Sequence, residues 1–305
     1  MVTRRIKAGG EFISTPNAVK AADNMRDGLA KAFYSRIFDR MVSRVNASLR
    51  IAGDVGEEGG RGRFFIGILD IFGFEVFDSN SLEQLCINFT NEKLQATFNQ
   101  IIFQAAMEEN AEEGVVVEVA DLSDIDNSET LELIEGNPSG VFALLNEECV
   151  VPKGSDASLL DKMFANLLGN KRLKRPLRNR TAFSINHYAA TVTYTSVGLL
   201  EKNKDPVSED LLVLMRSSGE IAVSELFAEK GDTLLLDRKK GARFQGLVAK
   251  FQRQLHDLLS VLDSSRTHFI RCIKPNLEMK PRCYDSLYVR SRLRAAGSLT
   301  ALRFM

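Results

Sequence analysis

The chain has 305 residues, and its 40 Lys and Arg are balanced by 40 Asp and Glu. Hydrophobic residues make up 44% of it and charged residues 26%, as in ordinary globular proteins. These values exclude an intrinsically disordered chain, a collagen-like fibre and a disulfide-dense secreted module. The balanced charge argues against a general nucleic-acid binder. No signal peptide opens the sequence, and the longest apolar run, Phe64–Phe77, is too short to span a bilayer, so we expect a soluble, intracellular protein.

The first predicted element is a long helix over about residues 17–46, because apolar residues recur every three or four positions there. A connector rich in glycine and charge follows at Gly53–Gly62 and is expected to be an exposed loop. The continuously apolar run Phe64–Leu69 then predicts a strand buried on both faces. The four cysteines form no CxxC pair and lack zinc-ligand spacing, so free and mostly buried thiols are expected.

A second long helix is predicted from Ser81 to Glu113. Ser81 and Gln84 fit a capping box at its start, and Gly114 is a natural stop. At ~1.5 Å per residue such a helix is roughly 45–50 Å long. Two interpretations remain open, since it is either a long core helix or a rigid element that carries a displacement from one end to the other.

The motif Asp-Ile-Phe-Gly-Phe-Glu at residues 70–75 follows the apolar run directly. A carboxylate at the C-terminal end of a buried strand lies where α/β sheets bind ligands, and Gly73 allows a backbone N–H to approach a phosphate closely. D-x-x-G in this context is typical of P-loop nucleotidases, in which Asp holds the Mg²⁺ shell and the Gly N–H contacts the γ-phosphate. The sequence contains no G-x-x-x-x-G-K-[ST]. The residues by themselves therefore predict half of a nucleotide site.

Longer motifs carry a family resemblance. Residues 67–77 (GILDIFGFEVF) and 80–95 (NSLEQLCINFTNEKLQ) resemble the switch II and relay-helix segment of myosin motor domains. Residues 183–189 with 200–206 are similar to a second myosin signature, and residues 268–276 to a third. The resemblance covers nearly the whole chain. It implies an α/β fold, namely a mainly helical part of the P-loop NTPase-type motor head with a few strands of its central mixed β-sheet.

The resemblance also implies a partial motor domain in four parts. Residues 1–50 match upper 50-kDa helices, and residues 64–113 match the switch II strand and loop with the relay helix. Residues 114–236 match the lower 50-kDa actin-binding subdomain, and residues 237–305 match a basic loop, a sheet strand and the reactive-thiol helix region. The phosphate loop, switch I, converter and light-chain-binding neck of the family have no counterpart in this sequence.

The resemblance also implies roles for individual site residues. Asp70 would contact a water bound to Mg²⁺, so that no residue ligates the metal directly, and the Gly73 N–H would sense the γ-phosphate. Glu75 would pair with a switch I arginine outside this sequence, and the helix from Ser81 would transmit closure of the site to a converter. ATP and Mg²⁺ are the cofactors implied for the full-length motor. Neither is expected to bind tightly to this chain alone.

Actin filaments are the implied partner. Asn127–Glu148 resembles the actin-docking helix-loop-helix, with Pro138, Val141 and Phe142 as apolar contacts at its tip; the alternative is a core hairpin in which Val141 and Phe142 are buried. Further contacts are implied in a basic surface loop, in a short variable basic loop, and in a segment whose leucine spacing looks more like core. They are Lys171, Arg172, Lys174, Arg175 and Arg178; Arg238, Lys239 and Lys240; and Leu255, Leu258, Leu259, His268, Arg271, Lys274, Asn276 and Leu277.

Three functions remain open at this point: part of an actin-based, ATP-driven motor, a nucleotide-free actin-binding module, and a non-functional truncated fragment. The intact DIFGFE motif favours the motor, because a pure binding module needs no phosphate sensor. Without a phosphate loop, the chain by itself should not hydrolyse ATP. We expect it in the cytoplasm on the actin cytoskeleton, with no nucleic-acid partner and no membrane span. Light chains or cargo would engage only segments outside this sequence.

Overall fold

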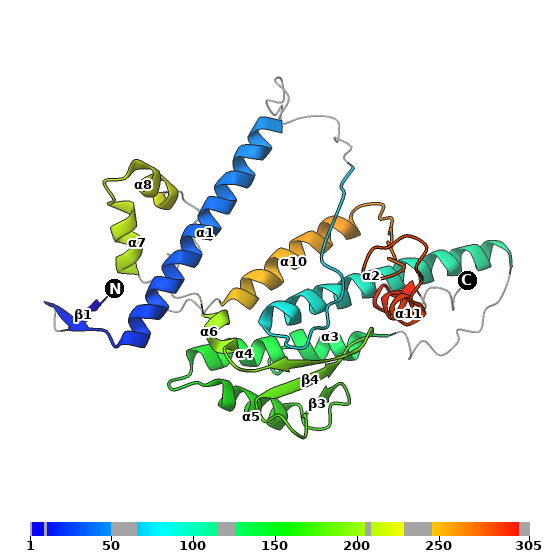
Figure 1. Ribbon diagram of the computed structural model, residues 1–305, viewed down its shortest axis with the longest axis horizontal. Coiled ribbons are helices and arrows are strands. Elements are labelled where there is room, and N and C mark those ends of the chain that lie inside the picture. Colours follow the sequence, from blue (N-terminus) through cyan, green and yellow to red (C-terminus); the bar gives the residue numbers. More distant parts are fainter. Residues whose placement is uncertain are drawn as a thin grey trace. The chain divides into compact units, whose positions relative to one another are not determined.

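The computed structural model describes residues 2–8, 11–49, 66–114, 126–204, 209–228 and 246–298. The chain divides into two compact units, one of residues 1–68 and 205–243 and the other of residues 69–204 and 244–305. Helices dominate the described residues of both units, which confirms the mainly helical character predicted (Figure 1). In the part of the chain described, no helix combines the length and the apolar character that a membrane crossing requires.

The first unit consists of a β-hairpin and helices. Its elements are β1 (Thr3–Ala8) and β2 (Glu11–Pro16), which pair antiparallel, α1 (Val19–Leu49), α7 (Glu209–Arg216) and α8 (Ile221–Ala228). A small core joins the helices, and the ring of Phe33 on α1 meets Phe227 on α8 edge-on at 4.9 Å. The helix predicted over residues 17–46 is confirmed as α1. Its apolar stripe is only partly buried, because Leu29 lies in this core whereas Met41 is 60% exposed.

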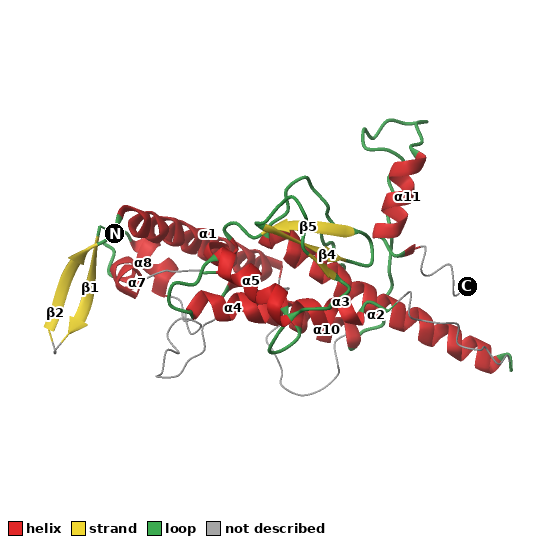
Figure 2. Cartoon of the chain, turned by 90° about the horizontal axis from the view of Figure 1, so that it is seen from below, coloured by secondary structure: helices red, strands yellow, loops and turns green. Residues whose placement is uncertain are grey.

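The second unit packs helices against a small sheet. Its helices are α2 (Leu82–Glu112), α3 (Ser128–Glu135), α4 (Val141–Val150), α5 (Asp156–Asn166), α6 (Leu199–Asn203), α10 (Leu247–Asp263) and α11 (Ser286–Ala295). The strands β3 (Leu173–Lys174), β4 (Ala182–Asn186) and β5 (Thr191–Thr195) form an antiparallel sheet in the order β3-β4-β5. Figure 2 shows β4 and β5 side by side in this sheet. Asn80 adds a parallel bridge to Tyr194 on β5. This bridge ties the start of α2 to the sheet.

α2 begins and ends where the sequence predicts. Ser81 is its N-cap, and the capping box with Gln84 forms, with the Ser81 N–H donating to the Gln84 side chain at 3.0 Å. Gly114 follows the helix with φ of +69°, a left-handed conformation that glycine adopts at little cost. The two helices predicted around the Pro138 turn are likewise formed, as α3 and α4.

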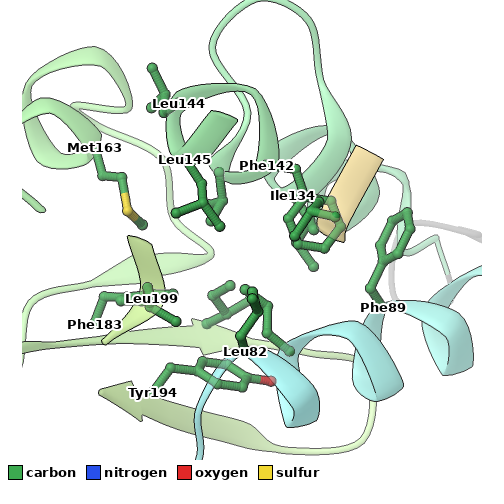
Figure 3. Packing of buried hydrophobic residues seen from close by; sticks show 14 of the residues in the cluster. Leu82, Phe89, Ile134, Phe142, Leu144, Leu145, Met163, Phe183, Tyr194 and Leu199 are labelled. Carbon is green, nitrogen blue, oxygen red and sulfur yellow. The ribbon is translucent and has the colours of Figure 1, made fainter. Parts of the chain in front are cut away.

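One continuous hydrophobic core holds the second unit together. Phe89 on α2 meets Phe142 on α4 edge-on with ring centroids 5.2 Å apart, and Phe183 on β4 stacks on Tyr194 on β5 (Figure 3). All four side chains are at most 1% exposed. Burial of a large apolar side chain contributes roughly 1.5–3 kcal/mol each, so these rings contribute substantially to the stability of the unit.

The strand predicted at Phe64–Leu69 does not form in the described residues. Residues 66–69 have no strand partner, and Ile66 and Ile68 are 96% and 95% exposed. A strand buried on both faces needs hydrogen-bonding neighbours, and residues 66–69 pair with none of the described strands. Residues 246–298 likewise contain helix and loop in place of the expected sheet strand. The prediction of mostly buried thiols is half right, because Cys86 and Cys149 are buried and Cys272 and Cys283 are exposed.

Candidate functional site

The D-x-x-G motif forms an exposed loop at residues 70–75. Asp70 and Gly73 are exposed, Glu75 is half-buried, and Phe74 is 5% exposed. The Phe74 ring lies edge-on to the His187 ring at 5.3 Å and to the Tyr188 ring at 5.5 Å, measured between ring centroids. Phe74 therefore anchors the loop in the core, while the carboxylate of Asp70 and the backbone of Gly73 face outward.

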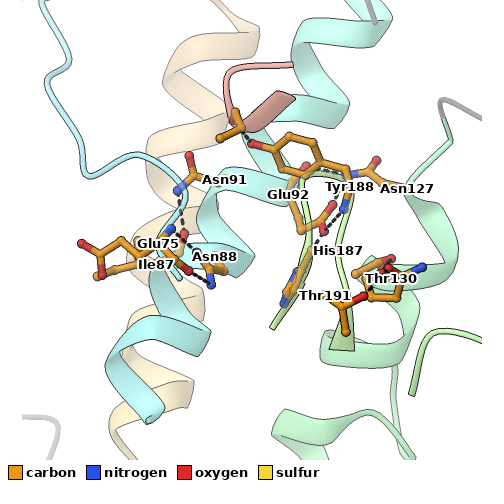
Figure 4. A network of polar contacts seen from close by, with 12 residues as sticks. Glu75, Ile87, Asn88, Asn91, Glu92, Asn127, Thr130, His187, Tyr188 and Thr191 are labelled. Carbon is orange, nitrogen blue, oxygen red and sulfur yellow. Dashed lines mark hydrogen bonds and ion pairs between the residues drawn. The ribbon is translucent and has the colours of Figure 1, made fainter. Parts of the chain in front are cut away.

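Two asparagines of α2 hold the backbone of this loop. The Asn88 amide accepts from the Glu75 N–H and donates to the Glu75 carbonyl, both at 2.8 Å (Figure 4). The Asn91 amide donates to the Phe72 carbonyl at 3.1 Å. Since Asn88 and Asn91 lie about one turn apart on the same face of α2, they bond the loop backbone to the early turns of that helix.

A buried polar chain continues from Asn88 into the core. Its amide donates to the Tyr194 hydroxyl at 2.9 Å, which contacts His187 Nε2 at 2.8 Å. His187 Nδ1 contacts a carboxylate oxygen of Glu92 at 2.9 Å, and Asn127 Nδ2 donates to the other oxygen (Figure 4). Burial raises the pKa of the Tyr194 hydroxyl, and its bond to Asn88 opposes this shift, so the phenol stays neutral at physiological pH. Satisfied buried networks of this kind specify one arrangement of the groups they join.

These residues were missed by the sequence analysis, although a signal was present. Polar side chains recur on α2 at the spacing of one helix face, and all of them are buried. They are Asn88, Asn91, Glu92 and Gln95. Because buried polar groups need partners, such a stripe inside a helix that also carries Leu85 and Phe89 predicts a hydrogen-bonded interface with another backbone segment.

Removing the Asn88 amide should loosen the loop. Asn88→Ala deletes both bonds to the Glu75 backbone and leaves that backbone and the Tyr194 hydroxyl short of a partner, so we expect a loss of about 1–3 kcal/mol in the free energy of unfolding. Amide hydrogen exchange at Glu75 should accelerate, measured by NMR or mass spectrometry. Gln104→Ala, on the exposed end of the same helix, is the control and should leave that rate unchanged. Unaltered protection of the Glu75 amide in the Asn88 variant would contradict the clamp, meaning the two hydrogen bonds by which the Asn88 side chain holds the Glu75 backbone.

The predicted apolar tip at residues 138–142 is corrected by the structure. Pro138 is exposed in the turn between α3 and α4, as predicted. Val141 and Phe142 are each 1% exposed and belong to the main core, so they offer no surface contact. The alternative of a core hairpin is the one observed. The reason is that α4 packs both side chains into the main core, where the Phe89 ring of α2 covers Phe142.

The basic surface loop lies between α5 and β4 and includes β3. Lys171, Lys174 and Arg178 are exposed. The remaining two members form ion pairs, from Arg172 Nε to Glu129 at 3.1 Å and from Arg175 Nη2 to Asp161 at 3.2 Å. Arg175 also covers the Phe164 ring at 5.0 Å. An additional residue, Leu177, is wholly exposed among these cations.

The remaining predicted contacts divide between core and surface. Leu255 is buried, and Leu258 and Leu259 are partly buried against the same core, as the leucine spacing of this segment indicated. Asn276 is 4% exposed and donates to the Lys280 and Cys283 carbonyls, so it holds its own loop. The exposed members are His268, Arg271, Lys274 and Leu277. The variable basic loop, Arg238, Lys239 and Lys240, lies outside the described residues.

The loop at residues 70–75 fits part of a phosphate and magnesium site. The Gly73 N–H has no acceptor among the described residues, and its exposed backbone allows close approach of an oxyanion. The exposed Asp70 carboxylate suits a contact to a metal-bound water. Within the described ranges no cluster of His, Cys, Asp or Glu is arranged to hold a metal ion directly. The Glu75 carboxylate has no ion-pair partner in the described part of the chain.

Comparison with known proteins agrees with the motifs. The family model for the myosin head (motor domain) matches residues 1–305. Similar proteins include Myosin-5 of Arabidopsis thaliana, 40% identical over 278 residues, and the Myosin-I heavy chain of Dictyostelium discoideum, 38% identical over 306 residues. These alignments cover 91% and 99% of this chain but only 17% and 12% of the two relatives. The chain therefore spans less than a fifth of the length of either protein.

Proposed function

Because the chain belongs to the myosin head (motor domain) family, we propose that it forms part of an actin-based motor that couples ATP hydrolysis to movement. The observation that carries the proposal is the clamp of Asn88 on the Glu75 backbone. Asp70 and Gly73 of the loop are exposed, and the loop backbone is hydrogen-bonded to the 31-residue helix α2. This arrangement suits the conversion of ligand binding into helix displacement.

Within this proposal each loop residue has a role. Asp70 accepts a hydrogen bond from a water on Mg²⁺, and the Gly73 N–H donates to the terminal phosphate of ATP. Bound Mg²⁺ supplies charge stabilisation to the transferring phosphoryl group. Glu75 pairs with an arginine outside this sequence and orders the loop over the phosphate. α2 then acts as the relay that carries the loop position along its length.

Hydrolysis is proposed for the longer motor and not for these residues alone. The sequence holds no phosphate-cradling G-x-x-x-x-G-K-[ST] motif, and a phosphate sensor without that loop retains few contacts to a nucleotide. We expect no significant ATP turnover by the isolated chain, measured as phosphate release. The proposal for this chain then concerns its actin-facing surface.

We assign that surface to the exposed basic loop and the turn at Pro138. Lys171, Lys174 and Arg178 carry positive charge without an ion pair among the described residues, and Leu177 adds an apolar contact between them. Such a surface is complementary to an acidic filament, and the attraction accelerates encounter at low salt. The same chemistry supports a role as an actin-binding module in the absence of nucleotide.

Neutralising the unpaired cations should weaken filament binding. For the triple variant K171Q/K174Q/R178Q we expect roughly tenfold weaker cosedimentation with actin filaments at low salt, and a smaller difference at high salt because exposed charges are screened. The control K20Q/K31Q/R44Q removes the same charge from exposed positions of α1. Equal binding by wild type and triple variant, or an equal loss in the control, would exclude the basic loop as the contact.

A further inference from the structure

A cation outside the D-x-x-G loop lies against its glycine. The Nη2 atom of Arg292, on α11, is 3.6 Å from the position that a Cβ on Gly73 would occupy. A Cβ and an amide nitrogen are bonded to the same Cα, so the guanidinium and the Gly73 N–H are within about 6 Å of each other. Residues 219 positions apart in the sequence thus share one small region of the surface.

α11 is held in this position by contacts to other elements of the second unit. The Tyr188 hydroxyl donates to the Ala295 carbonyl at 2.7 Å, whereas the start of the helix is capped locally by Asp285, which accepts from the Tyr288 N–H at 3.0 Å. Gly297 packs so closely on Gln95 of α2 that a Cβ would overlap the Gln95 side chain. Arg292 is therefore presented to the loop by an anchored helix, unlike a cation on a free surface segment.

The charge of Arg292 is not balanced by the described residues. No ion pair of Arg292 is present in the described part of the chain, and the Glu92 carboxylate is engaged by Asn127 and His187. A second guanidinium, Arg271, lies over the Phe98 ring at 5.0 Å and also makes no described ion pair. Burial raises the pKa of the Tyr188 hydroxyl and Glu92 raises it further, while Arg271 and Arg292 both act in the opposite direction. Both cations are thus within electrostatic reach of one side chain.

We propose that Arg292 is a further residue of the phosphate site, and that its guanidinium and the Gly73 N–H bind oxygens of the same tetrahedral phosphate. Both groups are donors without an acceptor among the described residues, and one carries a full charge. A guanidinium together with an open backbone N–H is a recurring phosphate-binding combination. The inference rests on the proposed role of Gly73. The phosphate is either the terminal group of a nucleotide or free inorganic phosphate.

The test compares Arg292→Gln with Arg290→Gln, which removes an exposed cation from the same helix. Binding of inorganic phosphate and, separately, of MgATP to the 305-residue chain is measured by isothermal titration calorimetry. We expect Arg292→Gln to weaken the binding of one of the two ligands by about tenfold or more, and we expect Arg290→Gln to leave that affinity nearly unchanged. A loss of affinity for inorganic phosphate identifies the free ion as the ligand. A loss of affinity for MgATP alone identifies the terminal phosphate of the nucleotide. Arg292→Lys should retain part of the affinity, because it keeps the charge without the planar fork.

Two results would overturn the proposal. One is binding that Arg292→Gln leaves intact, and the other is the absence of binding of either ligand to the wild-type chain. Neither result touches the actin-facing surface, which cosedimentation measures on the same samples. If filament binding persists while phosphate binding is insensitive to Arg292, the assignment of Arg292 fails and the proposed function stands. Circular dichroism of each variant verifies that α11 and its neighbours remain folded.

Discussion

Phe142→Ala is expected to lower the free energy of unfolding by about 3–5 kcal/mol, the range found when a buried aromatic ring is truncated in a packed core. Phe142 is 1% exposed and meets the Phe89 ring edge-on at 5.2 Å, so its removal opens a cavity between α2 and α4. Both helices are rigid elements anchored elsewhere in the core, which limits how far they can collapse into that space. Urea denaturation followed by circular dichroism measures the change.

The same variant separates a core role from a filament contact. Leu177→Ala, at a fully exposed position, is the matched control and should change stability by no more than about 0.5 kcal/mol. If Phe142 were a direct actin contact, its variant would keep wild-type stability and lose filament binding. If it is a core residue, binding per folded molecule should be preserved under conditions where the variant remains folded.

Glu92→Ala is expected to cost about 3–5 kcal/mol, because it removes the acceptor at the centre of the buried polar chain. The Glu92 carboxylate is fully buried and accepts from Asn127 Nδ2 and from the Tyr188 N–H, and it contacts His187 Nδ1. The Tyr188 N–H and His187 Nδ1 would be left inside the protein without this partner, while Asn127 Nδ2 would keep only its bond to the Glu92 backbone carbonyl, and each loss carries its own desolvation cost. Thermal and urea unfolding give the magnitude.

A second substitution keeps this prediction testable if the alanine variant does not fold. Glu92→Gln retains one carbonyl oxygen but places an NH₂ against a neighbouring donor, so a smaller loss of about 1–3 kcal/mol is expected. Glu109→Ala, at an exposed position near the other end of α2, should be nearly neutral. Equal stability of the Glu92 and Glu109 variants would mean that water replaces the network at no cost.

Local signals in the sequence were sufficient for α1, α2, α3 and α4. α2 starts at the capping box of Ser81 and Gln84 and ends before Gly114, because the hydrogen bonds that begin and end a helix involve residues within one turn of each other. The exposed turn at Pro138 follows from the same short-range chemistry. The motif at residues 70–75 also identified the candidate loop, since its glycine and carboxylates are a compact pattern with a chemical reason for each position.

Only the tertiary structure decided which face of each element is buried. An apolar pattern such as Val141-Phe142 or the leucines of α10 is compatible with a filament contact or with a core, and the partner that covers it, Phe89 in the case of Phe142, is distant in the sequence. The apolar run at Phe64–Leu69 shows the converse, because residues 66–69 have strand-like composition but no described neighbour to pair with.

The residues that contact the candidate loop were likewise decided only by the tertiary structure. Glu75 meets Asn88 across 13 positions, Glu92 meets His187 across 95, and Gly73 meets Arg292 across more than 200. Helix formation depends on hydrogen bonds between residues four apart, and a single sequence records that spacing directly. Contacts between distant residues depend on how the elements pack. The loop could therefore be located from its own residues, whereas the side chains that hydrogen-bond to it and the cation beside it could not.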